Sequence, residues 1–266
     1  MEEKLISFDI KADFGFLKKP DINEGIYLTY NCLHKPALLG ILGAVIGLKG
    51  HYHGHISGKK IPEYFEKLKN IKVGIQPIDS LKGNFSKTII TYNNSVGYAN
   101  LDGGNLIVSE QTLLKPSFRI YLLINFSNEY ERKVYEYIRN VESEFIPYLG
   151  KNDFQLWWEK ENVFEYKFSK EKFPKSSYSI ENLFVKPEGK AITQHDESHH
   201  NFIFDFNEPL SSDFFIFFER LPIGFDEKTN NYSFASFVYT NKKLSNHFIP
   251  KNLYYLDNEK KYIQLN

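Results

Sequence analysis

The stretch from Tyr30 to Gly50, YNCLHKPALLGILGAVIGLKG, limits the possible folds of this chain most strongly. Polar and cationic residues lead into a short apolar segment with helical spacing over 36–48. Its small residues recur every three or four positions and so share one helix face: Gly40, Gly43, Ala44 and Gly47. Each helical glycine costs about 1 kcal/mol relative to alanine. We therefore expect this face to lie almost in contact with a sheet.

The residues ahead of this helix suit an anion. Pro36 fits the first helical turn, where its missing N–H is no loss. Asn31, His34 and Lys35 lie at the helix end whose free N–H groups attract negative charge. They predict a place where a phosphate docks. On these residues alone, an ordinary buried helix with a solvated entry explains the pattern better.

Hydrophobic spacing elsewhere predicts alternating strands and helices. Strands are expected at Leu5–Phe16, Ile71–Gln76 and Phe118–Phe126, and helices at Ile61–Asn70 and Asn128–Phe145. The segment HYHGHISGKK between the first two helices is expected to be a loop. An extended hairpin is expected at 84–112, around the turn-rich ANLDGGN. This order of elements is that of a ferredoxin-like domain.

Beyond Trp158 the helical period gives way to short aromatic strands separated by Gly, Pro, Asn and Asp. Aromatic residues make up 17% of the chain and favour pleated sheets. We therefore predict an α+β protein with a ferredoxin-like (RRM-like) domain over residues 1–160. A smaller β-rich unit is predicted over residues 161–266.

The single cysteine, Cys32, excludes an internal disulfide and suits a reducing compartment. The N-terminus, MEEKLISFDIKADF, is acidic and alternating, unlike a signal peptide. The longest apolar run, Ala37–Leu48, is too short to span a bilayer. A cytoplasmic protein without membrane contact is expected.

Acidic and basic residues cancel over the whole chain, at 33 each, but not locally. Residues 49–90 hold eight lysines and three acids, a local charge of +5. Residues 196–231 hold eight acids and two basic residues, a local charge of −6. The basic part suits a nucleic acid and the acidic part a basic protein surface. Solvated faces are the alternative for both.

Two histidine clusters suggest more specific chemical roles, in catalysis or in metal binding. HYHGH at 51–55 has imidazoles that suit acid–base cleavage of RNA, although solvated loop histidines explain it better. QHDESHH at 194–200 has donors that suit zinc: His195, Asp196, Glu197, His199 and His200. Its spacing matches no metal motif of known geometry, so a polar loop is expected there. We expect no metal and no cofactor.

Four segments together resemble the Cas-five family of CRISPR-associated subunits, which belongs to the RAMP superfamily. They are HKPALLGILGAVIGL, EQTLLKPSFRIYLLIN, IPYLGKNDF and FERLPIGFDE. The four segments occur in the family's order, and the resemblance is closest to type I-B.

The resemblance implies a ferredoxin-like fold whose long hairpin, 84–112 here, is called the thumb. It implies binding of the 5′ handle of a CRISPR RNA (crRNA) within a type I, Cascade-like complex for antiviral defence. The implied neighbours are the Cas-seven backbone subunit and the Cas-eight large subunit, with target DNA recognised through the complex. A separate Cas-six ribonuclease is expected to cut the precursor, so this chain is predicted to be non-catalytic. A metal-independent endoribonuclease is the alternative.

Side chains suited to phosphates, 2′-hydroxyls and splayed bases gather at strand ends and loops of this frame. The predicted RNA-binding residues are Lys18, Lys19, His34, Lys35, Arg119, Tyr121, Gly150, Lys151 and Asn152. The predicted thumb contacts to RNA or to a partner subunit are Tyr92, Tyr98 and Leu101.

Overall fold

The central element of the computed structural model is an antiparallel sheet in the order β4-β7-β1-β8, in which β9 also pairs with β1. Its strands are β1 (Glu3–Ala12), β4 (Lys72–Pro77), β7 (Ser117–Asn125), β8 (Leu156–Trp157) and β9 (Phe164–Tyr166). The structure describes residues 2–22, 24–94, 106–170, 172–187, 203–205, 212–226, 228–229 and 231–266.

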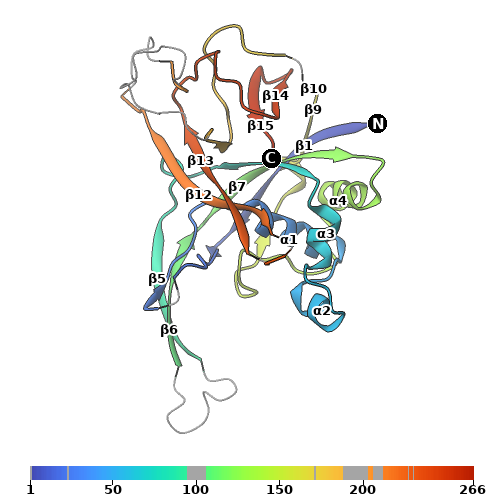
Figure 1. Cartoon of the computed structure of the whole chain (residues 1–266), viewed down its shortest axis with the longest axis vertical. Coiled ribbons are helices and arrows are strands. Elements are labelled where there is room, and N and C mark those ends of the chain that lie inside the picture. Colours follow the sequence, from blue (N-terminus) through green and yellow to red (C-terminus); the bar gives the residue numbers. More distant parts are fainter. Residues whose placement is uncertain are drawn as a thin grey trace.

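Helices α1 (Lys35–Ile46) and α4 (Glu129–Asn140) cover one face of this sheet (Figure 1). Ile6, Phe8 and Ile10 alternate along β1 and are buried in the core that also holds the apolar residues of both helices. With β8 and β9 in the fourth-strand position, the strand order is that of a βαββαβ unit. The α+β, ferredoxin-like prediction is confirmed.

The glycine face of α1 does contact another element closely, but the predicted partner is wrong. Gly40 and Gly43 lie against Tyr64 of the short helix α3 (Glu63–Leu68) and not against the sheet. Gly47 ends α1 in the left-handed conformation, with φ of 84°, and is its C-cap. The large apolar residues on the other faces of α1 pack toward the sheet.

The predicted loop after α1 is also wrong in part, because His51–Ile56 forms the short helix α2. The remaining short elements are β2 (Phe14–Gly15), β3 (Ile26–Tyr27), β10 (Phe168–Ser169), β11 (Phe184–Val185) and the 3-10 turn η2 (Lys160–Asn162).

The predicted hairpin is present between β4 and β7. Strand β5 (Lys87–Asn94) pairs with β6 (Leu106–Leu114), from Lys87 opposite Leu113 to Asn94 opposite Leu106. It projects away from the body of the molecule (Figure 1). Strands β2 and β3 pair with β6 and hold its base.

The C-terminal strands pack on the first region in two places. They are β12 (Ile216–Phe225), β13 (Tyr232–Thr240), β14 (Leu253–Leu256) and β15 (Lys261–Gln264). They form two small sheets, β11-β13-β12 and β10-β14-β15. Strands β14 and β15 cover one end of the second face of the central sheet, and β12 lies against α1. Leu183, Leu221 and Phe237 join the core of the first region, so the two parts share buried surface. The domain boundary at residue 160 stays a prediction.

Within the described residues, no helix has the length and apolar character needed to cross a membrane.

Alanine substitutions on the glycine face of α1 should have opposite effects. A Cβ at Gly43 would overlap Tyr64, whereas a Cβ at Gly40 would make ordinary contact with the Tyr64 ring at 3.8 Å. Gly43→Ala should lower the free energy of unfolding by about 1 to 2 kcal/mol, because overpacking outweighs the gain in helix propensity. Gly40→Ala should raise it by about 1 kcal/mol. Urea unfolding measures both, and equal stability of the two variants would contradict the contact.

Candidate nucleic-acid interface

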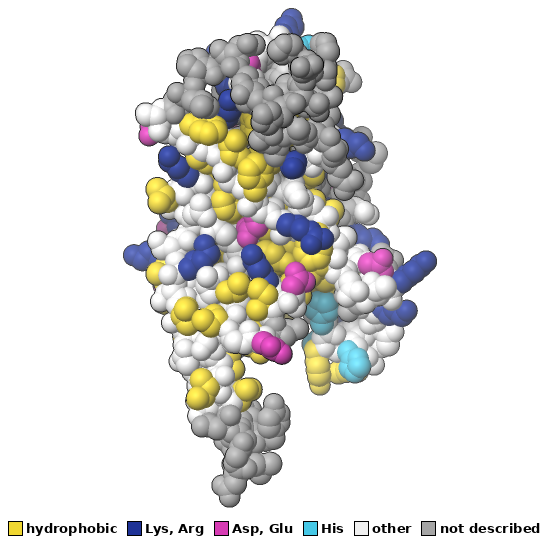
Figure 2. All heavy atoms as spheres, turned by 60° about the vertical axis from the view of Figure 1, so that its left-hand side comes forward, with side chains coloured by type: hydrophobic (Ala, Val, Ile, Leu, Met, Phe, Trp, Pro, Cys, Tyr) yellow, Lys and Arg dark blue, Asp and Glu magenta, His cyan; other side chains and the backbone are white. Residues whose placement is uncertain are grey.

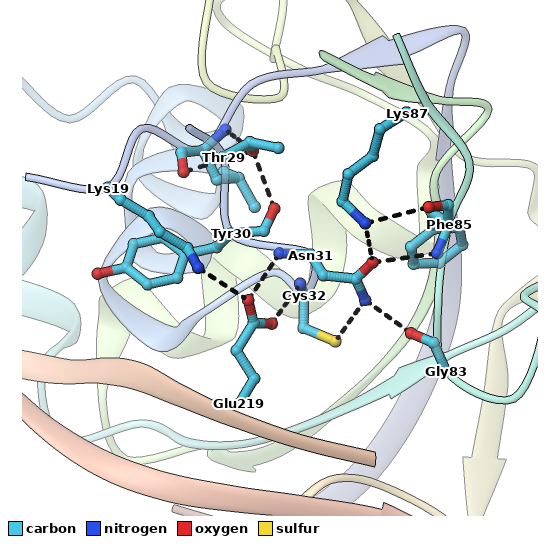
Figure 3. Close-up of polar contacts among 10 residues, drawn as sticks. Lys19, Thr29, Tyr30, Asn31, Cys32, Gly83, Phe85, Lys87 and Glu219 are labelled. Atoms are coloured by element: carbon cyan, nitrogen blue, oxygen red, sulfur yellow. Dashed lines mark hydrogen bonds and ion pairs between the residues drawn. The ribbon is translucent and has the colours of Figure 1, made fainter. Parts of the chain in front are cut away.

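The loop before α1 binds a carboxylate from the C-terminal region (Figure 3). The backbone N–H groups of Asn31 and Cys32 donate to the two carboxylate oxygens of Glu219, at 2.8 and 2.9 Å. Burial raises the pKa of Glu219, and the two N–H bonds oppose that shift. The sequence predicted an anion site ahead of α1, and the anion there is the chain's own Glu219 on β12.

The Asn31 side chain joins this loop to the base of the hairpin. Its amide nitrogen donates to the Gly83 carbonyl at 2.7 Å. Its oxygen accepts from the Phe85 N–H at 3.1 Å and from Lys87 Nζ at 2.8 Å. Helix α1, strand β5 and strand β12 are therefore fixed relative to one another at this point (Figure 3).

Lys19 lies near the Glu219 carboxylate, whereas Arg220 is on the other face of β12. Lys19 Nζ lies 3.9 Å from this carboxylate and 5.3 Å from the Tyr30 ring centre. Arg220 is exposed and lies over the Phe234 ring, at 4.5 Å. Figure 2 turns the left-hand side of Figure 1 forward, and on that face Lys and Arg side chains are interspersed with apolar and acidic ones. Cations at a surface suit the phosphates of a single-stranded nucleic acid.

A second group joins the hairpin to the turn before β8. Lys151 Nζ lies 2.7 Å from a Glu110 carboxylate oxygen and 4.5 Å from the Tyr92 ring centre. The Tyr92 hydroxyl donates to the other Glu110 oxygen at 3.0 Å. Glu110 pairs across the sheet with Tyr27, whose ring lies 3.8 Å from Lys18 Nζ. The structure thus brings the predicted residues Lys18, Lys151 and Tyr92 into one region.

The turn that carries Lys151 depends on Gly150. Its φ is 89°, and a Cβ there would overlap the Phe16 carbonyl oxygen. Only glycine fits this close approach of two backbones. Asn152 is exposed at the end of the turn.

The side chains of His34 and Lys35 are largely buried, and each bonds to another part of the chain. His34 is 5% exposed, and its Nδ1 accepts the Ala37 N–H, so it is the N-cap of α1. Burial lowers its pKa to about 3. Lys35 Nζ donates to the Asn266 carbonyl at 2.9 Å, and burial lowers its pKa to about 8. We leave both out of the proposed contact surface.

Arg119 and Tyr121 share one sheet face, as their alternation predicts, but their surroundings differ. Arg119 forms a bidentate ion pair with Asp9, at 2.7 and 2.8 Å, which holds the pKa of Arg119 above its ordinary value. Tyr121 is 3% exposed beneath the C-terminal strands and donates to Gln76 at 3.0 Å. Tyr121 therefore supports the sheet and presents no open ring.

Other predicted features are only partly visible. Tyr98 and Leu101 near the thumb tip lie outside the described residues, as does the cluster at 194–200. In the first histidine cluster, His51 Nε2 lies 3.3 Å from the Tyr64 hydroxyl, and its ring packs on Phe225. No group of three metal-ligating side chains occurs in the part of the chain that the structure describes.

Sequence reasoning missed the partners that position the predicted cations. They are Asp9, Glu110 and Glu219; the cations Lys87 and Arg220 were missed as well. The sequence does contain a signal for Glu219, because a charged residue stands inside the aromatic strand IFFERLPIGF. A charged side chain in such a strand needs a polar partner if it is buried.

The buried cap His34 should make stability depend on pH. Its pKa of about 3 lies below the ordinary value of 6.5, so the unfolded chain binds one more proton between these values. Stability should therefore fall as pH falls from 7 to 5, by about 2 kcal/mol from this group. His34→Asn keeps a capping side chain and should lose this part of the dependence in urea unfolding at both pH values. His53→Asn, at an exposed position, is the control, and an unchanged pH dependence in His34→Asn would contradict the assignment.

No protein-family model and no curated protein matches this chain. Among solved structures, a chain of the Type III-B Cmr-beta complex bound to cognate target RNA and AMPPnP is 11% identical, covers 99% of both chains and gives a TM-score of 0.48. A CRISPR protein from Archaeoglobus fulgidus is 10% identical, with 99% and 98% covered and a TM-score of 0.46. A chain of a CRISPR RNA-guided surveillance complex is 11% identical, with 92% and 94% covered and a TM-score of 0.44. At these identities and TM-scores, the likeness carries no conclusion about function.

Proposed function

We propose that this chain is an RNA-binding subunit of a CRISPR interference complex. In this proposal it holds the 5′ handle of the crRNA in a type I complex, beside a Cas-seven backbone subunit and a Cas-eight large subunit. The proposal includes no catalytic step in this chain.

The observation that carries the proposal is how the four family-like segments meet. Glu219 of FERLPIGFDE binds the two N–H groups immediately before HKPALLGILGAVIGL. Lys151 of IPYLGKNDF binds Glu110 of EQTLLKPSFRIYLLIN. Segments that are far apart in the sequence are thus joined in pairs, one at the base of the hairpin and the other midway along it. These contacts explain why the four family-like segments occur together in one chain: each needs another as its partner in the fold.

The chemistry of this surface supports RNA as the ligand. Lys19 and Arg220 are cations next to the rings of Tyr30 and Phe234. Phosphate contacts supply most of the affinity for a single strand. The hairpin beside it carries exposed apolar side chains, among them Ile89 and Ile107, which suit contact with another subunit.

Replacing Lys19 and Arg220 should weaken RNA binding and should also make the remaining binding less sensitive to salt. The double variant Lys19→Ala/Arg220→Ala should bind handle RNA more weakly than the unmodified chain. The slope of log affinity against log salt should become shallower by about 0.7 for each lost phosphate contact. Lys251→Ala, at an exposed position in the C-terminal part, is the matched control. Fluorescence anisotropy over a salt series measures both quantities, and unchanged slopes would contradict the proposal.

Incubation with labelled repeat RNA in EDTA should yield no product, because the proposal assigns binding alone to this chain. Denaturing gels would detect a cut that releases the handle. Such a cut, if lost in a His51→Ala/His53→Ala variant, would establish the metal-independent endoribonuclease instead.

A further inference from the structure

Two aromatic side chains remain open on the second face of the central sheet. Trp157 on β8 is 41% exposed, and Phe164 on β9 is 42% exposed. Trp157 pairs with Lys11 and Phe164 pairs with Ser7, so both rings lie on the face of β1 that carries its odd-numbered residues.

The C-terminal strands cover only one end of this face. Leu5, Tyr121 and Leu123 are buried there against residues of β14 and β15. The cover lies at the end of β1 that carries the N-terminus (Figure 1). Lys11 and Trp157 lie at the other end, beyond Asp9 and Arg119. Since Ser7 and Lys11 are four residues apart, the two rings are separated by about 13 Å along the strand.

The open end also carries two cations, of which Arg119 is held in place by Asp9. The Arg119 guanidinium lies 5.6 Å from the centre of the Phe164 ring. Asp9 binds the Nε and Nη2 donors of Arg119, and a guanidinium has five N–H donors in all. Donors therefore remain for an anion, and Lys11 adds a second cation next to Trp157. Planar rings flanked by cations match unpaired bases joined by phosphates.

We propose that this open end of the sheet, formed by Lys11, Arg119, Trp157 and Phe164, is a stacking site for unpaired bases of single-stranded RNA. Trp157 and Phe164 hold bases against their rings, and Lys11 and Arg119 contact the phosphates between them. The site is separate from the surface around Glu219, and it rests on the proposed RNA-binding function.

Removal of either ring tests the site in the full-length chain, with a labelled oligouridylate as the probe. Trp157→Ala and Phe164→Ala should each weaken binding by about 5-fold to 150-fold, the range for loss of one base–aromatic stack. The slope of log affinity against log salt should not change, because a stacked base releases no counterions. Phe145→Ala, at a 58% exposed ring beside the end of α1, is the matched control and should bind like the unmodified chain.

A conservative variant separates stacking from folding. Trp157→Phe keeps an aromatic ring and should retain most of the affinity that Trp157→Ala loses. The chain has two tryptophans, and Trp158 is buried, with its indole N–H bound to the Ile138 carbonyl. RNA should therefore quench tryptophan emission in the unmodified chain and much less in Trp157→Phe.

The outcomes distinguish this site from the proposed function. If both ring variants bind like Phe145→Ala while Lys19→Ala/Arg220→Ala loses affinity, the stacking site is wrong and the proposed function stands. If the unmodified chain binds no RNA, both are wrong. Equal loss in Trp157→Ala and Trp157→Phe would also overturn the site, because a ring would then make no difference.

Discussion

The arrangement of this molecule depends on one buried carboxylate. Glu219 accepts two backbone N–H groups from the loop that starts α1, and Asn31 in that loop binds the base of the hairpin. Helix α1, the hairpin and the C-terminal strands therefore meet at one point. Hydrogen bonds to a charged group each contribute about 1.5 to 3 kcal/mol, and an unpaired buried charge costs more. Glu219 thus fixes β12, and with it the sheet β11-β13-β12, against the loop that starts α1.

Strands β14 and β15 divide the second face of the central sheet into a covered and an open part. In a bare ferredoxin-like domain the whole face opposite the helices would be open. Here β14 and β15 cover Leu5, Tyr121 and Leu123, and the cover ends before Arg119. The buried part stabilises the sheet, while the open part keeps rings and cations at the surface. The C-terminal strands therefore determine which residues of the sheet remain available to a ligand.

The fold was more predictable than the site because periodicity reports burial. The spacing of apolar residues predicted the β1, β4, β7, α1 and α4 segments and their order. Periodicity does not identify a partner, and so Tyr64 was missed as the neighbour of Gly43. Predicted site residues also differ in burial: His34 is a buried N-cap, whereas Lys19 is partly exposed beside Glu219. The counter-ions Asp9, Glu110 and Glu219 come from distant strands, and only the three-dimensional pairing reveals them.

These three carboxylates explain how a chain with no net charge can present cations. In each ion pair the acid is the more buried partner. The exposed side-chain fractions are 34% for Lys19 against 9% for Glu219, 31% for Arg119 against 8% for Asp9, and 23% for Lys151 against 7% for Glu110. Each carboxylate holds its cation in place from below, and the cation is the group that solvent and a ligand meet. An approaching phosphate therefore meets positive charge first, while the acids act from a greater distance. At each of these three ion pairs, the difference in burial between acid and base decides which charge lies at the surface, whatever the net charge of the whole chain.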